Sequence, residues 1–298
     1  MERRSPKALG LASALSLTGC SLVLDFDSED AAPDAAIAID AALVDADPGF
    51  GPWQNIRPVT ELNGLAADLK ISLTGDGLEA TFDSDRDGPR NIYSATRAAL
   101  TEPWSNPVVV AELSTLVFDG HSALSDDGLT IFFARNQGMA VGVEILEAAR
   151  PVRGDLWGPA AVVASLSSAA TDDGPDISAD GQTLVFSSSR AGDRDLFIAS
   201  RMGADWLVSE LAELNTGDDE LDPDISPDLL ELYFARRIAD VSTVMVATRP
   251  DVASPFGNVT AVPELGDATG PRVSGDRRTI HFHRTEATTG VDLFVADR

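Results

Sequence analysis

The chain of 298 residues contains 48 Asp and Glu residues against 22 Lys and Arg, which gives a formal net charge of −26. This charge argues against nucleic acid and anionic membrane surfaces as ligands, because both are themselves negative. With Cys20 as its only cysteine, the chain cannot form an intramolecular disulfide.

The N-terminal residues have the order of a secretion signal. Basic residues at positions 3, 4 and 7 precede an apolar run over 8–17, and Leu-Thr-Gly then leads into Cys20. The run is too short for a transmembrane helix. Its ending resembles the lipobox of bacterial lipoproteins, which implies a fatty acid such as palmitate on Cys20. We predict a signal peptide over 1–20, with an ordinary signal and an incidental cysteine as the alternative.

Residues 21–52 are rich in Ala and Asp and contain no Lys or Arg. Such a segment buries little apolar surface, and a short helix over 35–46 would have no partner. We predict a disordered tether, which when extended would hold a folded domain up to roughly 100 Å from the lipid.

From residue 53 onward a pattern of turn, strand, turn and strand recurs five times, with a period of about 50 residues. Its clearest copy holds two apolar runs, 183–186 and 196–199, joined by a Gly-containing loop that is typical of a β-hairpin. Each copy carries an Asp before the first run, a Phe six residues later and an Arg at its end. These columns are Asp76, Asp127, Asp180, Asp228, Asp276; Phe82, Phe133, Phe186, Phe234, Phe282; and Arg97, Arg150, Arg201, Arg249, Arg298.

Between copies lies a segment that opens on an aromatic residue and ends at a Leu. The aromatic residues are Trp53, Trp104, Trp157, Trp206 and Phe256, and the Leu residues are Leu62, Leu113, Leu166, Leu214 and Leu265. We interpret this segment as the outermost strand of a blade. The aromatic residues recur at one repeat position, which predicts packing between blades rather than sugar platforms. The chain is therefore predicted to be all-β, a five-bladed β-propeller of four-stranded blades over 53–298.

The best-kept copy, 177–197, resembles the WD-like repeats of the TolB-type propellers of bacterial envelopes, and the resemblance covers about four fifths of the chain. Kelch repeats have a similar period, but their Gly-Gly pair is absent. The copies depart from the family pattern at Leu229 and Arg277, where it prefers Gly, and at Thr243, where it has Asp.

The number of strands predicts how the ring closes. The segment from Trp53 to Leu62 precedes every copy, whereas the fifth copy stops at Arg298 without an outer strand. We expect this N-terminal strand to complete the last blade, antiparallel to 292–297, and so to remove an unpaired edge.

Two columns of the inner strands differ from blade to blade and are therefore predicted to bind a ligand at the mouth of a central channel rather than to serve blade packing. They are Ser72, Ala123, Asp176, Asp224, Arg272 and Lys70, His121, Gly174, Asp222, Gly270. An acidic rim is expected beside them from Asp172, Asp173, Asp218, Asp219 and Glu220. We expect Asp176→Ala with Asp224→Ala to abolish partner capture and leave the fold intact. The alternative is that these charges are only solvated.

Two other motifs suggest metals. Asp83, Asp85 and Asp87 have the D-x-D-x-D-G form of calcium loops, but the position of the bidentate Glu falls on Ser94. His281 and His283 share a strand face, but no third ligand is near in sequence, so polar residues of a partly exposed face are the prediction. We predict no cofactor, with Ca²⁺ as the weaker hypothesis.

The predicted function is that of a non-catalytic, monomeric protein-interaction platform in a bacterial cell envelope. It is expected at the outer membrane, on the periplasmic or surface side, touching the membrane only through its lipid and binding an envelope protein with a basic surface. The alternative is a carbohydrate-binding or glycoside-hydrolysing five-bladed propeller, in which Asp176 and Asp224 supply acid and nucleophile or base. No G-x-S-x-G elbow is present.

Overall fold

Short runs rich in β-branched and aromatic residues, separated by Asp-Gly turns, pair into five antiparallel sheets of four strands each. The computed structural model describes residues 50–138, 142–287 and 290–298. The predicted signal peptide, Cys20 and all but the last residues of the predicted tether lie outside this part. Within it, no helix is long and apolar enough to cross a membrane.

Each sheet is one blade, and its strands follow one another from the inner to the outer edge. Blade 1 contains β2 (Asp68–Leu73), β3 (Glu79–Ser84), β4 (Asn91–Thr96) and β5 (Val108–Val109). Blade 2 contains β6 (Asp119–Leu124), β7 (Thr130–Asn136), β8 (Val143–Ala149) and β9 (Ala161–Val162). Blade 3 contains β10 (Asp172–Ile177), β11 (Thr183–Ser188), β12 (Asp195–Met202) and β13 (Asp205–Glu210).

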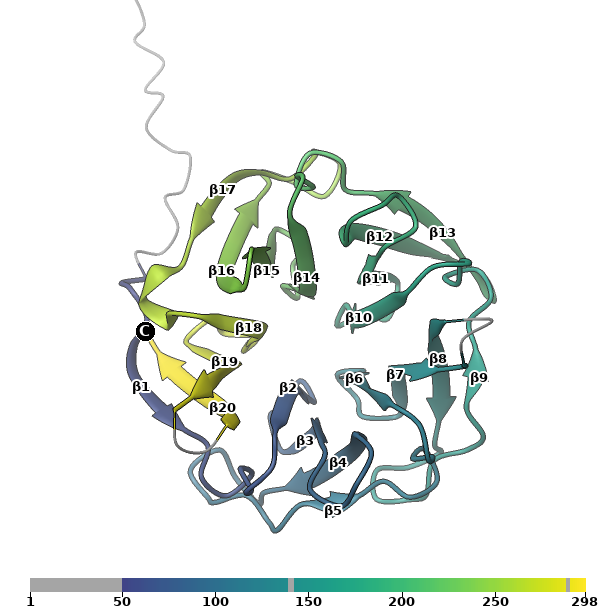
Figure 1. Ribbon diagram of the computed structural model, residues 1–298, viewed down its shortest axis with the longest axis vertical. Helices are drawn as coiled ribbons and strands as arrows, with labels where there is room; N and C mark the ends of the chain where they lie inside the picture. Colours follow the sequence, from purple (N-terminus) through teal and green to yellow (C-terminus); the bar gives the residue numbers. More distant parts are fainter. Residues whose placement is uncertain (1–49, 139–141, 288–289) are drawn as a thin grey trace, which may run out of the picture. The chain divides into compact units, whose positions relative to one another are not determined.

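Blade 4 contains β14 (Asp219–Ile225), β15 (Glu231–Ile238), β16 (Val241–Thr248) and β17 (Gly257–Ala261). Blade 5 contains β18 (Ala268–Val273), β19 (Thr279–Glu286), β20 (Gly290–Asp297) and β1 (Gln54–Pro58), and a short 3₁₀ helix, η1 (Pro263–Leu265), precedes it. The blades form a ring with β2, β6, β10, β14 and β18 nearest the centre (Figure 1). The predicted five-bladed propeller is confirmed.

The N-terminal strand closes the ring as predicted. β1 pairs antiparallel with β20, with Arg57 opposite Val295, and its backbone pairing continues from Val59 N–H to the Leu293 carbonyl at 2.9 Å. Beyond it the Asn63 side chain donates to the Leu293 carbonyl and accepts from the Leu293 N–H, at 3.0 and 2.8 Å. The strand is shorter than the predicted segment, because the chain leaves the sheet after Pro58.

The aromatic column packs inside the molecule, as predicted. All five side chains are buried: Trp53, Trp104, Trp157, Trp206 and Phe256. The Arg that ends each copy stacks on the aromatic residue that opens the next segment, at 4.2 to 4.5 Å from guanidinium carbon to ring centroid. The pairs are Arg97–Trp104, Arg150–Trp157, Arg201–Trp206, Arg249–Phe256 and Arg298–Trp53. This contact explains the Arg column and, through Trp53, joins the two ends of the propeller.

A Ser/Thr-x-Asp motif shapes the turn between the first two strands of each blade. In blade 3 the Ser178 hydroxyl donates to the Asp180 carboxylate at 2.6 Å, and Asp180 accepts the Gln182 N–H at 2.9 Å. The residue that follows the Asp has a left-handed backbone in every copy, which Gly181 adopts freely at φ 67°. Leu229 and Arg277 keep this conformation at φ 63° and 59°, so the departures from the repeat strain single turns without changing the fold.

These turns make the free energy of unfolding of the propeller depend on pH. Hydrogen bonds from a Ser hydroxyl and from the backbone lower the pKa of Asp127, Asp180 and Asp276. Their stabilisation is therefore complete above the unfolded-state pKa of about 3.9 and is lost as the pH falls through the lower folded-state value. We expect Ser178→Ala to lower the free energy of unfolding by about 1 kcal/mol at pH 7 and by less at pH 2. Urea unfolding at the two pH values measures this, and an equal loss at both would contradict it.

Candidate functional site

The first predicted column links neighbouring blades through the backbone. Asp176 in blade 3 accepts the N–H of Ile225 in blade 4 at 2.9 Å, and Asp224 in blade 4 accepts the N–H of Val273 in blade 5 at 2.9 Å. Ser72 accepts the Leu124 N–H between blades 1 and 2 in the same way. The expectation that blade packing does not dictate this column is therefore wrong. Ala123, which has no polar side chain, is the exception.

Arg272 completes this layer from blade 5. Its Nη1 lies 3.0 Å from Oδ1 of both Asp176 and Asp224, and its Nη2 donates to the Leu73 carbonyl of blade 1 at 3.0 Å. Both aspartates are at most 3% exposed. Burial raises the pKa of Asp224, and the neighbouring Asp176 carboxylate raises it further, against the lowering effect of Arg272. The three side chains form a buried ionic cluster, which we call the Arg272 cluster.

The expected acidic rim is mostly a set of buried ion pairs. An acidic residue at or near the start of an inner strand meets an Arg on the second strand or just after it in four blades: Asp68–Arg86, Asp119–Arg135, Asp172–Arg190 and Glu220–Arg236. Asp172 and Glu220 are fully buried, so their assignment to an exposed rim is wrong. The same pair recurs in four blades, where it joins the inner strand to the second strand. The sequence pattern alone does not distinguish this buried pair from exposed surface charges.

The other rim residues have different surroundings. Asp173 is 4% exposed and pairs with Arg194. Asp219 is half-buried and lies 2.5 Å from Nη2 of Arg237, and Asp218 is also half-buried. Only Asp218 and Asp219 therefore keep part of the predicted rim accessible.

The second predicted column lies at a β-bulge in each inner strand. All five residues have left-handed backbones: Lys70 at φ 22°, His121 at 50°, Gly174 at 60°, Asp222 at 50° and Gly270 at 59°. Gly adopts this conformation freely, whereas a side chain there costs about 1–2 kcal/mol. Two blades use Gly, and the other three place a charged or ionisable side chain at this position.

Those three side chains meet across the centre of the ring. Lys70 Nζ lies 3.7 Å from Asp222 Oδ1, and His121 Nδ1 lies 4.0 Å from the same oxygen, although neither blade 1 nor blade 2 is next to blade 4. Thr269 also donates to Asp222 at 2.9 Å. The pKa of Asp222 is low, because Lys70, His121 and His283 together outweigh the raising effect of burial. We call Lys70, His121 and Asp222 the axial cluster.

The proposed metal ligands are held by the fold. The Asp83 carboxylate accepts the His121 N–H at 2.7 Å, Asp85 accepts the Ala67 N–H at 2.9 Å, and Asp87 accepts from the Tyr93 hydroxyl at 2.6 Å. The three carboxylates of the D-x-D-x-D-G loop thus have separate partners. In residues 50–138, 142–287 and 290–298, no group of three His, Cys, Asp or Glu side chains could hold a metal ion.

His281 and His283 are both buried, at 6% and 5% exposure, so the prediction of a partly exposed face is wrong. His283 Nδ1 accepts the Lys70 N–H at 3.1 Å, and burial lowers the pKa of His283 to about 4. His281 has no such backbone partner for its own Nδ1.

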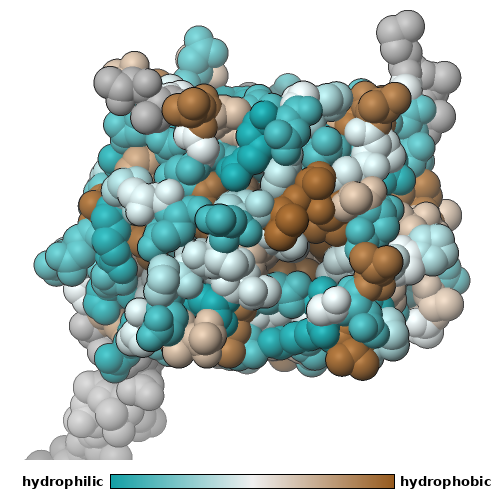
Figure 2. All heavy atoms as spheres, turned by 90° about the horizontal axis from the view of Figure 1, so that it is seen from below, coloured by the Kyte–Doolittle hydropathy of each residue, from teal (hydrophilic) through white to brown (hydrophobic). Residues whose placement is uncertain are grey.

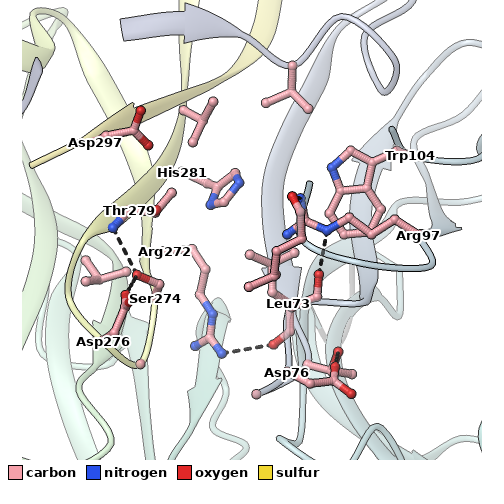
Figure 3. A pocket seen from close by; sticks show the side chains of 18 of the residues that line it. Leu73, Asp76, Arg97, Trp104, Arg272, Ser274, Asp276, Thr279, His281 and Asp297 are labelled. Atoms are coloured by element: carbon pink, nitrogen blue, oxygen red, sulfur yellow. Dashed lines mark hydrogen bonds between the residues drawn. The ribbon is translucent and has the colours of Figure 1, made fainter. Parts of the chain in front are cut away.

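The sequence did not reveal a pocket of about 990 Å³ between blades 5 and 1, which we call the seam pocket. Most of its lining comes from β1, β19 and β20 on one side and from blade 1 on the other. It extends inward past Arg272 to Asp126, Ile177 and Ile225 of blades 2, 3 and 4. Figure 3 shows His281, Leu73, Arg97 and Trp104 around it, with Arg272 at one end.

One position of the repeat contributes to the wall of the seam pocket. The residue before the Phe column packs toward the aromatic residue at the outer strand of the next blade. Phe132 of blade 2 contacts Trp206 of blade 3 at 6.0 Å between ring centroids, and Tyr233 of blade 4 shares a core cluster with Trp53 of blade 5. Between blades 5 and 1 this position is His281, facing the segment of Trp104. The signal was present in the column Thr81, Phe132, Val185, Tyr233, His281, but only the tertiary structure shows that it borders a cavity.

The outer surface offers no rival site in the view of Figure 2. There hydrophobic side chains lie in separate groups among hydrophilic ones. Single exposed apolar residues, such as Val108 on β5 at 62% exposure, are normal on soluble proteins. The seam pocket is therefore the candidate site that we consider further.

No protein-family model matches the chain, and no curated protein matches it significantly. Among solved structures, a protein assigned as TolB from Agrobacterium tumefaciens aligns with a TM-score of 0.53 at 17% identity, over 80% of this chain and 77% of that one. TolB from Acinetobacter baumannii aligns with a TM-score of 0.54 at 17% identity, over 80% of this chain but only 56% of that one. A chain of the nidogen/laminin complex aligns with a TM-score of 0.50 at 13% identity, over 73% of this chain and 72% of that one. At these identities the likeness concerns the fold alone. The chain is a five-bladed β-propeller structurally similar to the propeller of TolB.

Proposed function

We propose that this protein is a non-catalytic protein-interaction platform, held in a bacterial cell envelope by a lipid on Cys20. We further propose that it meets its partner at the end of the propeller where the seam pocket opens. The observation that carries this proposal is the pocket itself. Its volume of about 990 Å³ is at the upper end of the range for ligand pockets, and it combines buried apolar walls with a few polar groups.

The surroundings of the pocket suggest the character of the partner. Glu61, Glu102 and Asp276 line it and are exposed, and the whole chain has a formal net charge of −26. Complementary charge guides protein association and selects partners. A partner with a basic surface around its contact region therefore fits this end of the propeller.

The contacts within the Arg272 cluster disfavour the alternative that the protein is a glycosidase. Such an enzyme needs two carboxyl groups that can reach a sugar, one as acid and the other as nucleophile or base. One oxygen each of Asp176 and Asp224 lies 3.0 Å from the same Arg272 nitrogen, and the other accepts a backbone N–H at 2.9 Å. Hydrolysis of a glycan by the purified protein would contradict the non-catalytic proposal.

Site-specific crosslinking in cells tests where the partner binds. A photo-crosslinking residue at Glu102, beside the seam pocket, should capture one envelope protein. The same residue at Pro89, in the exposed loop between β3 and β4 at the opposite end of blade 1, should not. Capture should weaken as salt rises, because exposed charges are screened over about 8 Å at physiological ionic strength. Equal capture from both positions, or none from Glu102, would contradict the proposed site.

The anchor is tested separately. In cells given an alkyne fatty acid, the natural chain should become labelled and fractionate with membranes, whereas Cys20→Ser should do neither. An unlabelled natural chain, or a Cys20→Ser chain that remains with membranes, would show that the lipid anchor is wrong.

A further inference from the structure

We propose that the inner part of the seam pocket binds the carboxylate of an apolar ligand, with Arg97 and His281 as its polar contacts. The carboxylate is either that of a small free acid or that of the carboxyl end of a partner chain. The inference rests on the proposed function only in using the same end of the propeller.

His281 is the first observation. Its side chain is buried, at 6% exposure, yet its Nδ1 has no hydrogen-bond partner. It lies on the wall of the seam pocket, between the two blades (Figure 3). An unpaired buried polar atom is energetically unfavourable. A ligand in the pocket that pairs with the imidazole would remove this cost.

Arg97 is the second observation. Its guanidinium stacks at 4.2 Å over Trp104 and donates to the carbonyls of Gly77 at 2.8 Å and Leu100 at 3.2 Å. Within the described residues it forms no ion pair, whereas Arg150 at the same position of blade 2 pairs with Glu79 at 2.6 Å. The seam between blades 1 and 2 thus supplies a carboxylate to its Arg, whereas none of the described acidic residues that line the seam pocket forms an ion pair with Arg97.

The charges near His281 favour an anion. Burial, together with the guanidiniums of Arg97, Arg272 and Arg57, lowers the pKa of His281 to about 3, so the imidazole is neutral at pH 7. A neutral imidazole donates from one nitrogen and accepts at the other. Asp297 is the acidic residue that acts against these cations, and it already pairs with Arg57 at 2.6 Å.

The apolar walls of the seam pocket indicate that the part of the ligand beyond its carboxylate is apolar. Val59, Leu73, Trp104 and Val295 line the pocket and are buried. The acidic residues Glu61, Asp76, Glu102 and Asp276 are exposed, and Asp76 pairs with Arg153. An apolar body against these walls, with a carboxylate directed at Arg97 and His281, satisfies both parts of the pocket.

The test uses matched pairs of probes and the full chain. The probes are 3-phenylpropionate with its amide, and the peptide acetyl-Ala-Leu-Phe with a free or an amidated carboxyl end. Dissociation constants come from calorimetry and ligand-observed NMR. We expect each acid to bind at least tenfold more tightly than its amide, because a charge-assisted hydrogen bond contributes about 1.5–3 kcal/mol. A free acid that binds as tightly as the peptide indicates a small-molecule ligand, and a peptide that binds tenfold more tightly indicates a chain end.

Three variants localise the binding. His281→Phe should replace the imidazole by an apolar ring, as Phe132 does at the same repeat position, and so weaken binding of the acids at least tenfold without loss of melting temperature. Arg97→Gln should weaken binding of the acids at least tenfold. Arg249→Gln is the matched control, because Arg249 also stacks on an aromatic ring, at 4.3 Å, and bonds a turn carbonyl, at 2.7 Å, but lies outside the pocket.

The inference is overturned if acid and amide bind equally, if neither binds up to about ten millimolar, or if Arg249→Gln weakens binding as much as Arg97→Gln does. These results do not bear on crosslinking from Glu102. Loss of probe binding with intact crosslinking contradicts this inference alone, and loss of crosslinking with intact probe binding contradicts the proposed function alone.

Discussion

Replacing Asp176 and Asp224 together by alanine is expected to lower the free energy of unfolding by about 3–5 kcal/mol. The Arg272 guanidinium lies between these two buried carboxylates, with Nη1 3.0 Å from each, and 12% of the Arg272 side chain is exposed. Burial alone would lower the pKa of Arg272, but the two aspartates raise it overall, so they stabilise its charged form. Without them a buried cation has lost both ionic partners. The backbone N–H groups of Ile225 and Val273 lose their acceptors as well.

The control is the triple variant that adds Arg272→Met. Replacing a whole buried ionic cluster by apolar residues is often neutral or stabilising, so this variant should recover most of the lost stability. Urea unfolding followed by circular dichroism measures all three proteins. A double variant as stable as the natural chain would contradict the role of the cluster. The sequence suggested that the double variant would leave the fold intact and so test binding. Because we expect it to destabilise the fold, it cannot serve as that test.

Removal of the first 63 residues should prevent stable folding of the monomer. The shortened chain loses β1, the buried side chains of Trp53, Val59 and Leu62, and the stacking of Arg298 on Trp53. Truncating one large buried side chain typically costs about 2–5 kcal/mol, and whole domains are stable by only about 5–15 kcal/mol. The edge of β20 would also be left without a partner strand, which favours aggregation.

The matched control is a chain that begins at residue 50. It keeps all of β1 and the contact of Phe50 with Arg298, at 4.5 Å, so its melting temperature should be nearly that of the full chain. Thermal unfolding and size-exclusion chromatography of the two shortened chains compare them directly. A monomeric chain lacking residues 1–63 with an unchanged melting temperature would show that β1 does not close the ring.

The two clusters at the centre of the ring also explain why a site there was predicted. Residues that differ between repeats, such as Lys70 and Asp222, do mark positions that local blade packing leaves open. In this propeller such residues form ion pairs between blades that are not neighbours. Lys70 lies 3.7 Å from Asp222, and Arg272 lies 3.0 Å from Asp176. Variation within a repeat therefore identified where the blades interact with one another, and the binding role of these residues stays a prediction.

The sequence by itself determined the number of blades, their four strands, the closure by β1 and the buried aromatic column, because each depends on a pattern that recurs about every 50 residues. Only the tertiary structure decided what the non-repeating residues do. Asp172 and Glu220 are buried because each meets an Arg on or just after the adjacent strand of its own blade, and the sequence does not distinguish such a buried pair from exposed charges. Arg272 meets Asp176 because ring closure brings blades 5 and 3 together across the axis. The seam pocket likewise exists because closure sets His281 against the segment of Trp104, two residues far apart in the sequence that no local periodicity relates.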